Sequence, residues 1–322
     1  MDINLILSPI QSELQAVEVR LRESIHVEFE PLTNVFESLI GSGGKRIRPA
    51  LSVLSTKFHP TDLDKALTLA VATELVHAAT LIHDDLIDKS PLRRGRPTIN
   101  TRWSGTATVL AGDFLLARAA DIAASLDNFR VMRIFARTLM DICDGEIRQD
   151  FGGARWPPNR EEYYRHIDSK TASLFIAGTE SGAILSGAPE AEISALKDFG
   201  HNLGRAFQIV DDILDFTADQ SALGKPVGSD LRQGTLTLPV FYFIEQPRHG
   251  SQLEDALQKE DRDSTEMNEL IDSIRHSSAI EASKVEARRF VHRAQERLAI
   301  LPDNLYRRAL SDLANYVVER TL

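Results

Sequence analysis

Cysteine is almost absent from this chain, which has only Cys143 in 322 residues. One cysteine excludes a disulfide framework and a zinc site built from cysteines, and it fits a reducing compartment. We expect Cys143 to be a small core residue. Positive charge is also scarce, because 37 Lys and Arg oppose 47 Asp and Glu, for a net charge of -10. Such a chain repels nucleic acid and anionic lipid, so polyanion binding is not expected to be its main role.

The chain also lacks clear signals for export or membrane insertion. Its start, "MDINLILSPIQSELQ", has acidic residues and no basic region before the short apolar run, so it does not resemble a signal peptide. The longest apolar run, Ala66 to Ile82, is interrupted by Glu74 and His77. We expect this run to be too short and too polar to span a bilayer. The default expectation is a soluble, cytoplasmic protein without a transmembrane segment.

Strand signals are scarce as well, since period-two alternation is rare and no Asn-Gly hairpin turn occurs. Ala, Leu, Glu and Arg dominate, and apolar residues recur at intervals of three and four, which predicts an all-α protein. The expected helices cover 10–38, 44–57, 62–89, 98–103, 106–124, 129–151, 160–185, 190–218, 235–246, 266–275, 278–297 and 303–321.

The breaks between these helices are short, and none resembles an interdomain linker, so we expect one domain over residues 1–322. The stretch Thr217 to Leu236 is too long to be idle inside a compact domain. A second polar stretch, Pro247 to Thr265, is rich in charge, and we expect it to be a solvated excursion from the core.

The most unusual segment is "TLIHDDLID" at 80–88, which places carboxylates in an apolar run. On a helix, Asp84 and Asp88 lie one turn apart on one face, and His77 lies two turns before Asp84. In the core these carboxylates need cations, because burial and mutual repulsion disfavour their charged forms. A set of oxygen donors favours Mg²⁺ over zinc.

The same spacing recurs in "FQIVDDILDF" at 207–216, where Asp211, Asp212 and Asp215 follow Gln208. Two such helices facing each other across a cavity could hold a cluster of Mg²⁺ ions, completed by phosphate oxygens and water. This arrangement predicts a diphosphate substrate. The alternative is that each triplet is a solvated helix face. Two copies in apolar surroundings favour the metal site.

Basic residues accompany the acidic motifs and lie beside Gly-rich turns, where guanidinium groups and free backbone N–H groups can hold phosphate. They predict two diphosphate sites, one with metal and one without. A lone surface cation is usually only solvated, so the prediction depends on their placement together. The residues are Lys45, Arg46 and Arg48 in "GGKRIRP", Arg93 and Arg94 in "DKSPLRRGRPT", Lys170 in "DSKTASL" and Lys225 in "GKPVGSD".

In their order along the chain these motifs resemble those of the trans-polyprenyl diphosphate synthases, the isoprenoid chain-elongating prenyltransferases, and most closely the long-chain members. The resemblance covers most of the first three quarters of the chain. It implies an isoprenoid synthase fold, a single large orthogonal helical bundle around a deep central cavity, and a homodimer. The motifs also include "AGDFLLARA" (111–119), "DGEIRQ" (144–149) and "GKPVGSDLRQGTLTLP" (224–239).

The resemblance also implies a role for each residue. Asp84, Asp88 and Asp211 would bind about three Mg²⁺ ions on the allylic diphosphate, with Asp85, Asp212 and Asp215 assisting through water. Thr171 and Gln208 would present oxygen dipoles near the allylic cation. The diphosphate ligands would be Arg93, Lys170 and Lys225 for the allylic substrate, and Lys45, Arg48, His77 and Arg94 for isopentenyl diphosphate at the metal-free site.

Three residues need separate weighing. The alignment of His77 with Asp84 favours the binding role over that of an ordinary hydrogen-bonded histidine. His83 has no such alignment, and we expect it to be structural. Thr235 stands where many relatives carry a second lysine, so one diphosphate contact is in doubt.

Chain length is predicted from the small residues just before the first motif. With the diphosphate at Asp84, the growing chain runs toward the N-terminal end of that helix, and one turn of about 5.4 Å approximates one isoprene unit. Ala79 and Thr80 would leave the tunnel open, where farnesyl-making relatives place a bulky aromatic. Met132, Phe135 and Leu139 share a face that would form either the next floor or plain core. By the resemblance we expect a long product of the octaprenyl, solanesyl or decaprenyl type, with a short-chain product, geranylgeranyl or farnesyl diphosphate, as the alternative.

Three rival functions are weaker. A class I terpene cyclase would carry an Asn/Asp, Ser/Thr and Glu pattern as its second metal motif, where this chain has "DDILD". A metal phosphohydrolase of the HD type, suggested by "HDD", would need separated histidine ligands converging on the metal. A non-catalytic synthase subunit would tend to lack intact Asp-rich motifs, and both are intact here.

Overall fold

Helices make up nearly all the regular structure of the computed structural model, which describes residues 2–41, 43–93, 95–152, 158–218, 226–246, 249–257 and 265–320. The two strands in the described part, β1 (Leu92–Arg93) and β2 (Arg96–Pro97), pair antiparallel as a small hairpin. Gly95 supports its tight turn with φ 72°. The expected all-α fold is confirmed, and the hairpin was missed.

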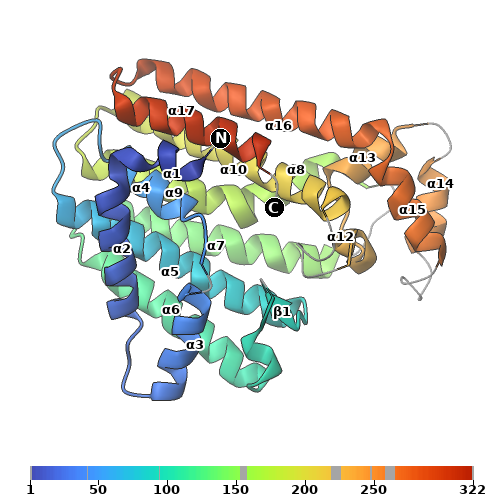
Figure 1. Cartoon of the computed structure of the whole chain (residues 1–322), viewed down its shortest axis with the longest axis horizontal. Coiled ribbons are helices and arrows are strands. Elements are labelled where there is room, and N and C mark those ends of the chain that lie inside the picture. The colour runs from blue at the N-terminus through green and yellow to red at the C-terminus, as the bar shows by residue number, and fades with distance from the viewer. Residues whose placement is uncertain are drawn as a thin grey trace. The chain divides into compact units, whose positions relative to one another are not determined.

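The main helices follow one another with short connections, as Figure 1 shows along the colour ramp. They are α1 (Ile3–Ile6), α2 (Gln11–Ser24), α3 (Glu30–Gly41), α4 (Ile47–Ser55), α5 (Leu63–Ile87), α6 (Gly105–Ala124), α7 (Phe129–Gly152), α8 (Arg160–Ile167), α9 (Ser173–Leu185), α10 (Glu190–Thr217), α12 (Ser229–Gln233), α13 (Leu238–Ile244), α14 (His249–Leu257), α15 (Thr265–Arg275), α16 (Ser278–Arg297) and α17 (Leu305–Glu319). Short turns lie at η1 (Ser8–Ile10), η2 (Ile99–Thr101), η3 (Asp168–Ala172) and η4 (Leu298–Ile300).

The chain forms two compact units, which we describe separately. Unit 1 comprises Met1–Leu139, Leu174–Gly200 and Arg297–Leu313, and unit 2 comprises Met140–Ser173, His201–Glu296 and Ala314–Leu322. The single domain expected over 1–322 stays a prediction.

Helix α5 is the central element of unit 1, where it packs against α2, α4 and α6. Asp62 caps its start by accepting a hydrogen bond from Asp64 N at 2.9 Å. Close contact with α6 depends on Gly112, because an added Cβ there would lie 2.2 Å from His83 Nε2. The two helices therefore meet at van der Waals distance directly beside the first Asp motif.

The membrane expectation for α5 needs a correction. This helix has 25 residues, and by length and composition alone it could cross a bilayer. Our estimate that the run is too short was therefore wrong, since the helix extends beyond Ala66 to Ile82 at both ends. However, 72% of its most apolar window is buried inside the protein. This burial is what a core helix of a globular fold shows, because such a helix is apolar on all sides.

In unit 2 the π-helical turn η3 joins α8 to α9. Two glycines allow neighbouring helices to approach it. An added Cβ at Gly145 would lie 2.7 Å from Ser169 Cβ, and one at Gly204 would lie 2.5 Å from Ala172 Cα. On one side of the turn, Asp168 accepts hydrogen bonds from Arg205 Nε at 2.6 Å and from His201 Nε2 at 2.8 Å.

Several predicted elements differ from the structure. The expected helix 10–38 is two helices, since residues 25–29 between α2 and α3 are not helical. The expected helix 160–185 contains the turn η3. Part of the expected solvated excursion is helix α14, whose Leu253 is fully buried. Cys143 is exposed rather than a core residue.

Candidate active site

The last two turns of α5 carry the first Asp motif of unit 1. Asp84 is half-buried, Asp85 is 5% exposed, and Asp88 is exposed at the C-cap. The N–H of Asp88 donates to the carbonyl of Asp84 at 2.8 Å, so these residues are one turn apart as predicted. The two accessible carboxylates are therefore Asp84 and Asp88, and the buried one is Asp85.

Asp85 is paired with the hairpin that follows α5. Arg93 Nε donates to its Oδ1 at 2.7 Å, and Asn100 Nδ2 donates to its backbone carbonyl at 3.0 Å. Burial raises the pKa of the Asp85 carboxyl, and the nearby Asp84 and Asp88 add to that rise, while Arg93 opposes it. The motif thus holds Arg93 through its buried carboxylate, Asp85.

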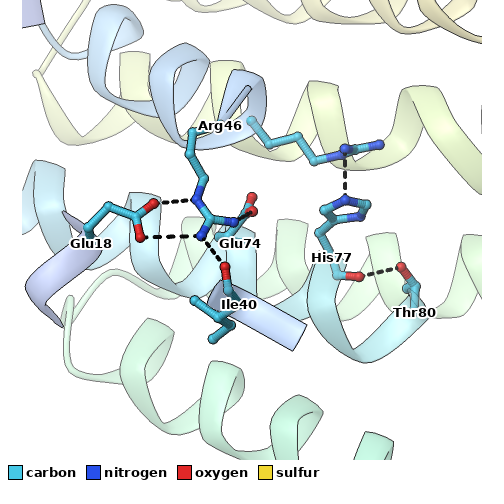
Figure 2. Close-up of polar contacts among 7 residues, drawn as sticks. Glu18, Ile40, Arg46, Glu74, His77 and Thr80 are labelled. Atoms are coloured by element: carbon cyan, nitrogen blue, oxygen red, sulfur yellow. Dashed lines mark hydrogen bonds and ion pairs between the residues drawn. The ribbon is translucent and has the colours of Figure 1, made fainter. Parts of the chain in front are cut away.

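A second polar group in unit 1 lies two turns earlier on α5, drawn in Figure 2. Arg48 Nη1 lies 3.2 Å from His77 Nε2. A guanidinium only donates, so Nε2 accepts and the ring proton is assigned to Nδ1. The Arg48 guanidinium also lies 5.1 Å from the Phe175 ring centroid. Lys45, three residues before Arg48, is exposed.

The chain-length residues of unit 1 lie on α5 and α7. Ala79 is fully buried and Phe135 is 4% exposed. Thr80 is half-buried, and its hydroxyl donates to the carbonyl of His77 at 2.8 Å (Figure 2). Burial alone fits both plain core and a tunnel wall, so their role in chain length stays a prediction.

In unit 2 the second Asp motif has its middle carboxylate in a closed network. Asp212 is 2% exposed, and its two oxygens accept from Tyr163 OH at 2.6 Å and from Gln208 Nε2 at 2.9 Å. Burial raises the pKa of Asp212 to about 8, assisted by Asp230 and Asp211 and opposed by the two donors. Burial also keeps the pKa of Tyr163 well above its usual value, so Tyr163 stays a donor.

The outer carboxylates of this motif have other contacts. Asp211 Oδ1 accepts from Arg320 Nη2 at 2.6 Å, and that guanidinium lies 3.8 Å from the Phe207 ring centroid. Asp215 is 2% exposed and accepts from Asp230 N at 3.2 Å, which orders the start of α12. Of the three carboxylates, Asp211 is therefore the accessible one, with 41% of its side chain exposed.

The turn η3 carries Lys170 and Thr171, and it brings Thr171 into contact with Gln208. Thr171 is 5% exposed and donates from Oγ1 to Gln208 Oε1 at 2.6 Å. Because Gln208 donates its amide to Asp212, the orientation of its amide oxygen toward Thr171 is fixed. Lys170 Nζ lies 2.8 Å from Glu146 Oε1. Thr235 accepts from Gln149 Nε2 at 3.3 Å instead of offering a second ammonium.

Two predicted ligands, Arg94 and Lys225, lie outside the described residues. In the described ranges, no group of three or more His, Cys, Asp or Glu side chains converges as a metal site. His83 instead contacts α6, with Nε2 3.2 Å from the Val109 carbonyl. The donor set does fit Mg²⁺, because accessible carboxylates at one-turn spacing supply hard oxygen ligands.

Four contributors were missed from the sequence: Tyr163, Glu146, Glu74 and Arg320. A buried Asp212 requires a donor, so a tyrosine partner could have been expected, but nothing fixed which one. Arg320 is 109 residues from Asp211 in the chain, and no local spacing connects them.

The comparisons with known proteins agree with this picture. The family model "Polyprenyl synthetase" matches residues 29–274. The chain is 41% identical to heptaprenyl diphosphate synthase component 2 from Geobacillus stearothermophilus, over 99% of both chains. It is 36% identical to an all-trans-nonaprenyl-diphosphate synthase from Rhodobacter capsulatus, over 98% of this chain and 97% of the relative.

The chain belongs to the polyprenyl synthetase family. A polyprenyl synthase from Caulobacter crescentus, solved with calcium and isoprenyl diphosphate, superposes with a TM-score of 0.93 at 33% identity, over 99% of this chain and 98% of that one. The resemblance seen in the sequence, including its long-chain character, is thereby confirmed. The protein is a prenyltransferase with the all-α fold of this family.

Proposed function

We propose that this chain condenses isopentenyl diphosphate with an allylic diphosphate, in the presence of Mg²⁺, to give a long-chain polyprenyl diphosphate. The observation that carries the proposal is the pair Asp84 and Asp88, accessible and one turn apart, in a motif whose middle residue, Asp85, binds Arg93. The hepta- and nonaprenyl relatives support a long product. The relative solved with calcium and isoprenyl diphosphate supports a divalent cation and a diphosphate substrate.

For the metal we propose Asp84, Asp88 and Asp211 as direct ligands, with Asp85, Asp212 and Asp215 supporting them. When bound, about three Mg²⁺ ions would offset the charge that develops on the departing diphosphate. The raised pKa of Asp212 agrees with the supporting role, because a buried carboxyl that is neutral near pH 7 is better suited to hydrogen bonding than to ligation.

For the diphosphates we propose two sets of basic residues. Arg93, Lys170 and Lys225 hold the allylic diphosphate, and Lys45, Arg48, His77 and Arg94 hold isopentenyl diphosphate without metal. In this scheme Arg93 and Lys170 exchange their carboxylate partners, Asp85 and Glu146, for phosphate oxygens. The exchange keeps each cation paired with an anion.

For the allylic cation we propose Thr171 and Gln208 as the stabilising dipoles. The Gln208 oxygen cannot rotate away without breaking the bond to Asp212, so it is preorganised for developing positive charge. Apolar helices around the site exclude water, which would otherwise trap the cation. We propose that the released diphosphate accepts the proton.

We further propose a homodimer and a cytoplasmic location. The exposed, free Cys143 fits a reducing compartment. One relative is named as component 2 of its synthase, which raises the alternative that this chain acts with a second subunit.

The deciding experiment uses the purified chain alone with Mg²⁺, radiolabelled isopentenyl diphosphate and each short allylic primer, followed by chain-length analysis. We expect a long-chain product that disappears with EDTA. Asp84→Asn should lower the rate by about a hundredfold or more, whereas Asp121→Asn, on an exposed site of α6, should not. Absence of any elongated product would refute the proposal. Phosphate release from a nucleotide would favour the hydrolase, and activity only after adding a second subunit would favour the two-component form.

A further inference from the structure

Arg46 has a backbone conformation that is unusual for a residue with a side chain. It is the N-cap of α4 and has φ 47° and ψ 37°, in the left-handed region. Non-glycine residues rarely adopt this conformation, because Cβ comes too close to the backbone carbonyl. It persists where surrounding contacts over-determine it. The side chain of Arg46 provides those contacts.

The Arg46 guanidinium connects three other segments of unit 1, as Figure 2 shows. It donates to both carboxylate oxygens of Glu18 on α2, to the carbonyl of Ile40 on α3 at 2.8 Å, and to Glu74 Oε1 on α5 at 2.7 Å. Four of its five N–H donors are therefore used inside the protein. Arg46 is therefore not available as a phosphate ligand.

The charged groups of this network stabilise one another. The side chains of Arg46 and Glu74 are only 15% and 8% exposed. Burial raises the pKa of Glu74, and Arg46 and Arg48 oppose that rise. Burial disfavours the charge on Arg46, and Glu18 and Glu74 more than compensate, so the pKa of Arg46 is raised. Removing Arg46 leaves the buried Glu74 without this counter-ion, whereas removing Glu74 leaves Arg46 paired with Glu18.

The Arg46–Glu74 contact lies close to the Arg48–His77 contact of the proposed isopentenyl diphosphate site. Glu74 and His77 lie three residues apart on α5 and thus on one face. Arg46 meets Glu74, and two residues later Arg48 meets His77 at 3.2 Å. Figure 2 shows the labelled Glu74 and His77 on the same helix. The position of Arg46 therefore sets where Arg48 reaches α5 and where the exposed Lys45 is presented.

We propose that Arg46 is a positioning residue for isopentenyl diphosphate: its guanidinium locks residues 45–48 onto α5 and thereby aims Lys45, Arg48 and His77 at one diphosphate. The proposal rests on the proposed function, which assigns those three residues to isopentenyl diphosphate. It adds a residue that does not touch the substrate and that selectively affects one of the two substrates.

The test compares Arg46→Gly and Arg46→Lys with a matched control, Arg20→Gln. Glycine adopts the left-handed conformation freely, so Arg46→Gly removes the guanidinium without backbone strain. Arg20 also joins α2 to α5, through Asp64 at 2.7 Å, but it has no contact with residues 45–48. The readouts are the dissociation constant of isopentenyl diphosphate alone without metal, KM for each substrate, and the unfolding temperature.

We expect Arg46→Gly to weaken isopentenyl diphosphate binding about tenfold or more, since small misplacements of binding groups are costly, with the allylic KM within about twofold. Arg46→Lys should weaken isopentenyl diphosphate binding less than Arg46→Gly does. The lysine keeps a positive charge, but an ammonium lacks the planar fork that joins Glu18 to Glu74. Arg20→Gln should change the binding of neither substrate. Unchanged binding in Arg46→Gly would overturn the proposal, as would equal losses for both substrates in proportion to a lower unfolding temperature.

If Arg46→Gly does not fold, Glu18→Gln takes its place in the test. Glu18→Gln removes the charge at the exposed end of the network, with Glu18 36% exposed, and leaves Arg46 paired with Glu74. The same selective loss for isopentenyl diphosphate, smaller in size, is expected, and its absence counts against the proposal. If wild-type protein makes no elongated product, the proposed function itself fails, which is a different result from a wild-type enzyme that is insensitive to Arg46.

Discussion

At the scale of single residues, His166 in the last turn of α8 is a group held neutral by its surroundings. Its Nδ1 is buried and has no hydrogen-bond partner within the described part of the chain, and Lys170 lies one turn further on. Burial is the main cause that lowers the pKa of His166 to about 4, and the Lys170 charge adds to it, against opposing effects of Gly145 and Asp230. The unfolded chain therefore binds a proton on this residue at a pH where the folded protein does not.

This difference predicts a pH dependence of stability. Between about pH 6.5 and 4 the unfolded state binds more protons, so the free energy of unfolding falls as pH falls through this window and is unaffected above it. His166→Gln should remove that loss, and wild type should lose about 1–2 kcal/mol more than the variant between pH 7 and 5. Urea unfolding of metal-free protein at both pH values measures it. His292→Gln, 74% exposed, is the control, and equal slopes for wild type and His166→Gln would contradict the prediction.

Tyr163 gives a second prediction at this scale, because it is the hydroxyl donor to the buried Asp212. Tyr163→Phe leaves a buried carboxyl oxygen without that donor, which should cost about 1–3 kcal/mol of unfolding free energy. The control is Tyr164→Phe, whose hydroxyl makes only a 3.4 Å bond to Glu286 and whose loss should cost less than about 0.5 kcal/mol. Denaturant unfolding distinguishes the two, and equal costs would mean that the Asp212 contact contributes little.

At the scale of elements, the turn η3 is held by glycines on its neighbours. Gly204→Ala would place a Cβ 2.5 Å from Ala172 Cα, which is backbone and cannot move aside cheaply. Overpacking should cost about 1–3 kcal/mol, despite a gain of about 1 kcal/mol in helix propensity. Activity should fall further than stability predicts, since η3 carries Lys170 and Thr171. Gly41→Ala, where an added Cβ meets no atom within 4 Å, is the control.

Thermal unfolding and the condensation rate, measured below the unfolding transition, check this prediction. If Gly204→Ala behaves like Gly41→Ala in both, the glycine contact does not shape the turn. A loss of stability with a normal rate would mean that η3 keeps its geometry and that α10 moves instead.

The helices show which elements a sequence can predict. Helices α5 and α10 were expected at 62–89 and 190–218 and lie at Leu63–Ile87 and Glu190–Thr217, because long apolar periodicity dominates their choice of structure. The break before α3 had a signal that we underweighted. Pro31 lies in the first turn of α3, where its missing N–H is tolerated, whereas inside a continuous 10–38 helix it would remove a hydrogen bond.

Other elements could not be predicted from the local sequence. The π-helical turn depends on Gly145, Gly204 and the Asp168–Arg205 pair, all tertiary contacts from distant parts of the chain. The accessible residues Asp84 and Asp88 followed from helical spacing alone. The buried Asp85 and Asp212 did not, because which carboxylate of a triplet faces the core depends on the packing partner. The role of Arg46 was likewise read as anion binding until its contacts assigned its donors to Glu18, Ile40 and Glu74.

At the scale of the whole molecule, the length of the product depends on how much of the interior the growing chain can enter. The proposed path runs from Asp84 toward the N-terminal end of α5, where Ala79 and Thr80 are small. A ring at either position should end elongation within about one and a half turns, or roughly 8 Å, of the metals. We therefore expect Ala79→Tyr and Thr80→Phe to convert a long-chain product into a short-chain one.

The two variants differ in how much they are expected to destabilise the fold, so measuring both separates an effect on chain length from an effect on stability. Ala79 is fully buried, so a tyrosine there can also overpack α5 at a cost of about 1–3 kcal/mol. Thr80 is half-buried and loses only the bond to the His77 carbonyl. Leu110→Phe, at a site 61% exposed on α6, adds a ring outside the core as the control. Chain-length analysis of radiolabelled product is the measurement. Folded variants that still make the wild-type product would show that the chain grows along a different path, because a ring this close to the metals cannot be bypassed in a tunnel that follows α5.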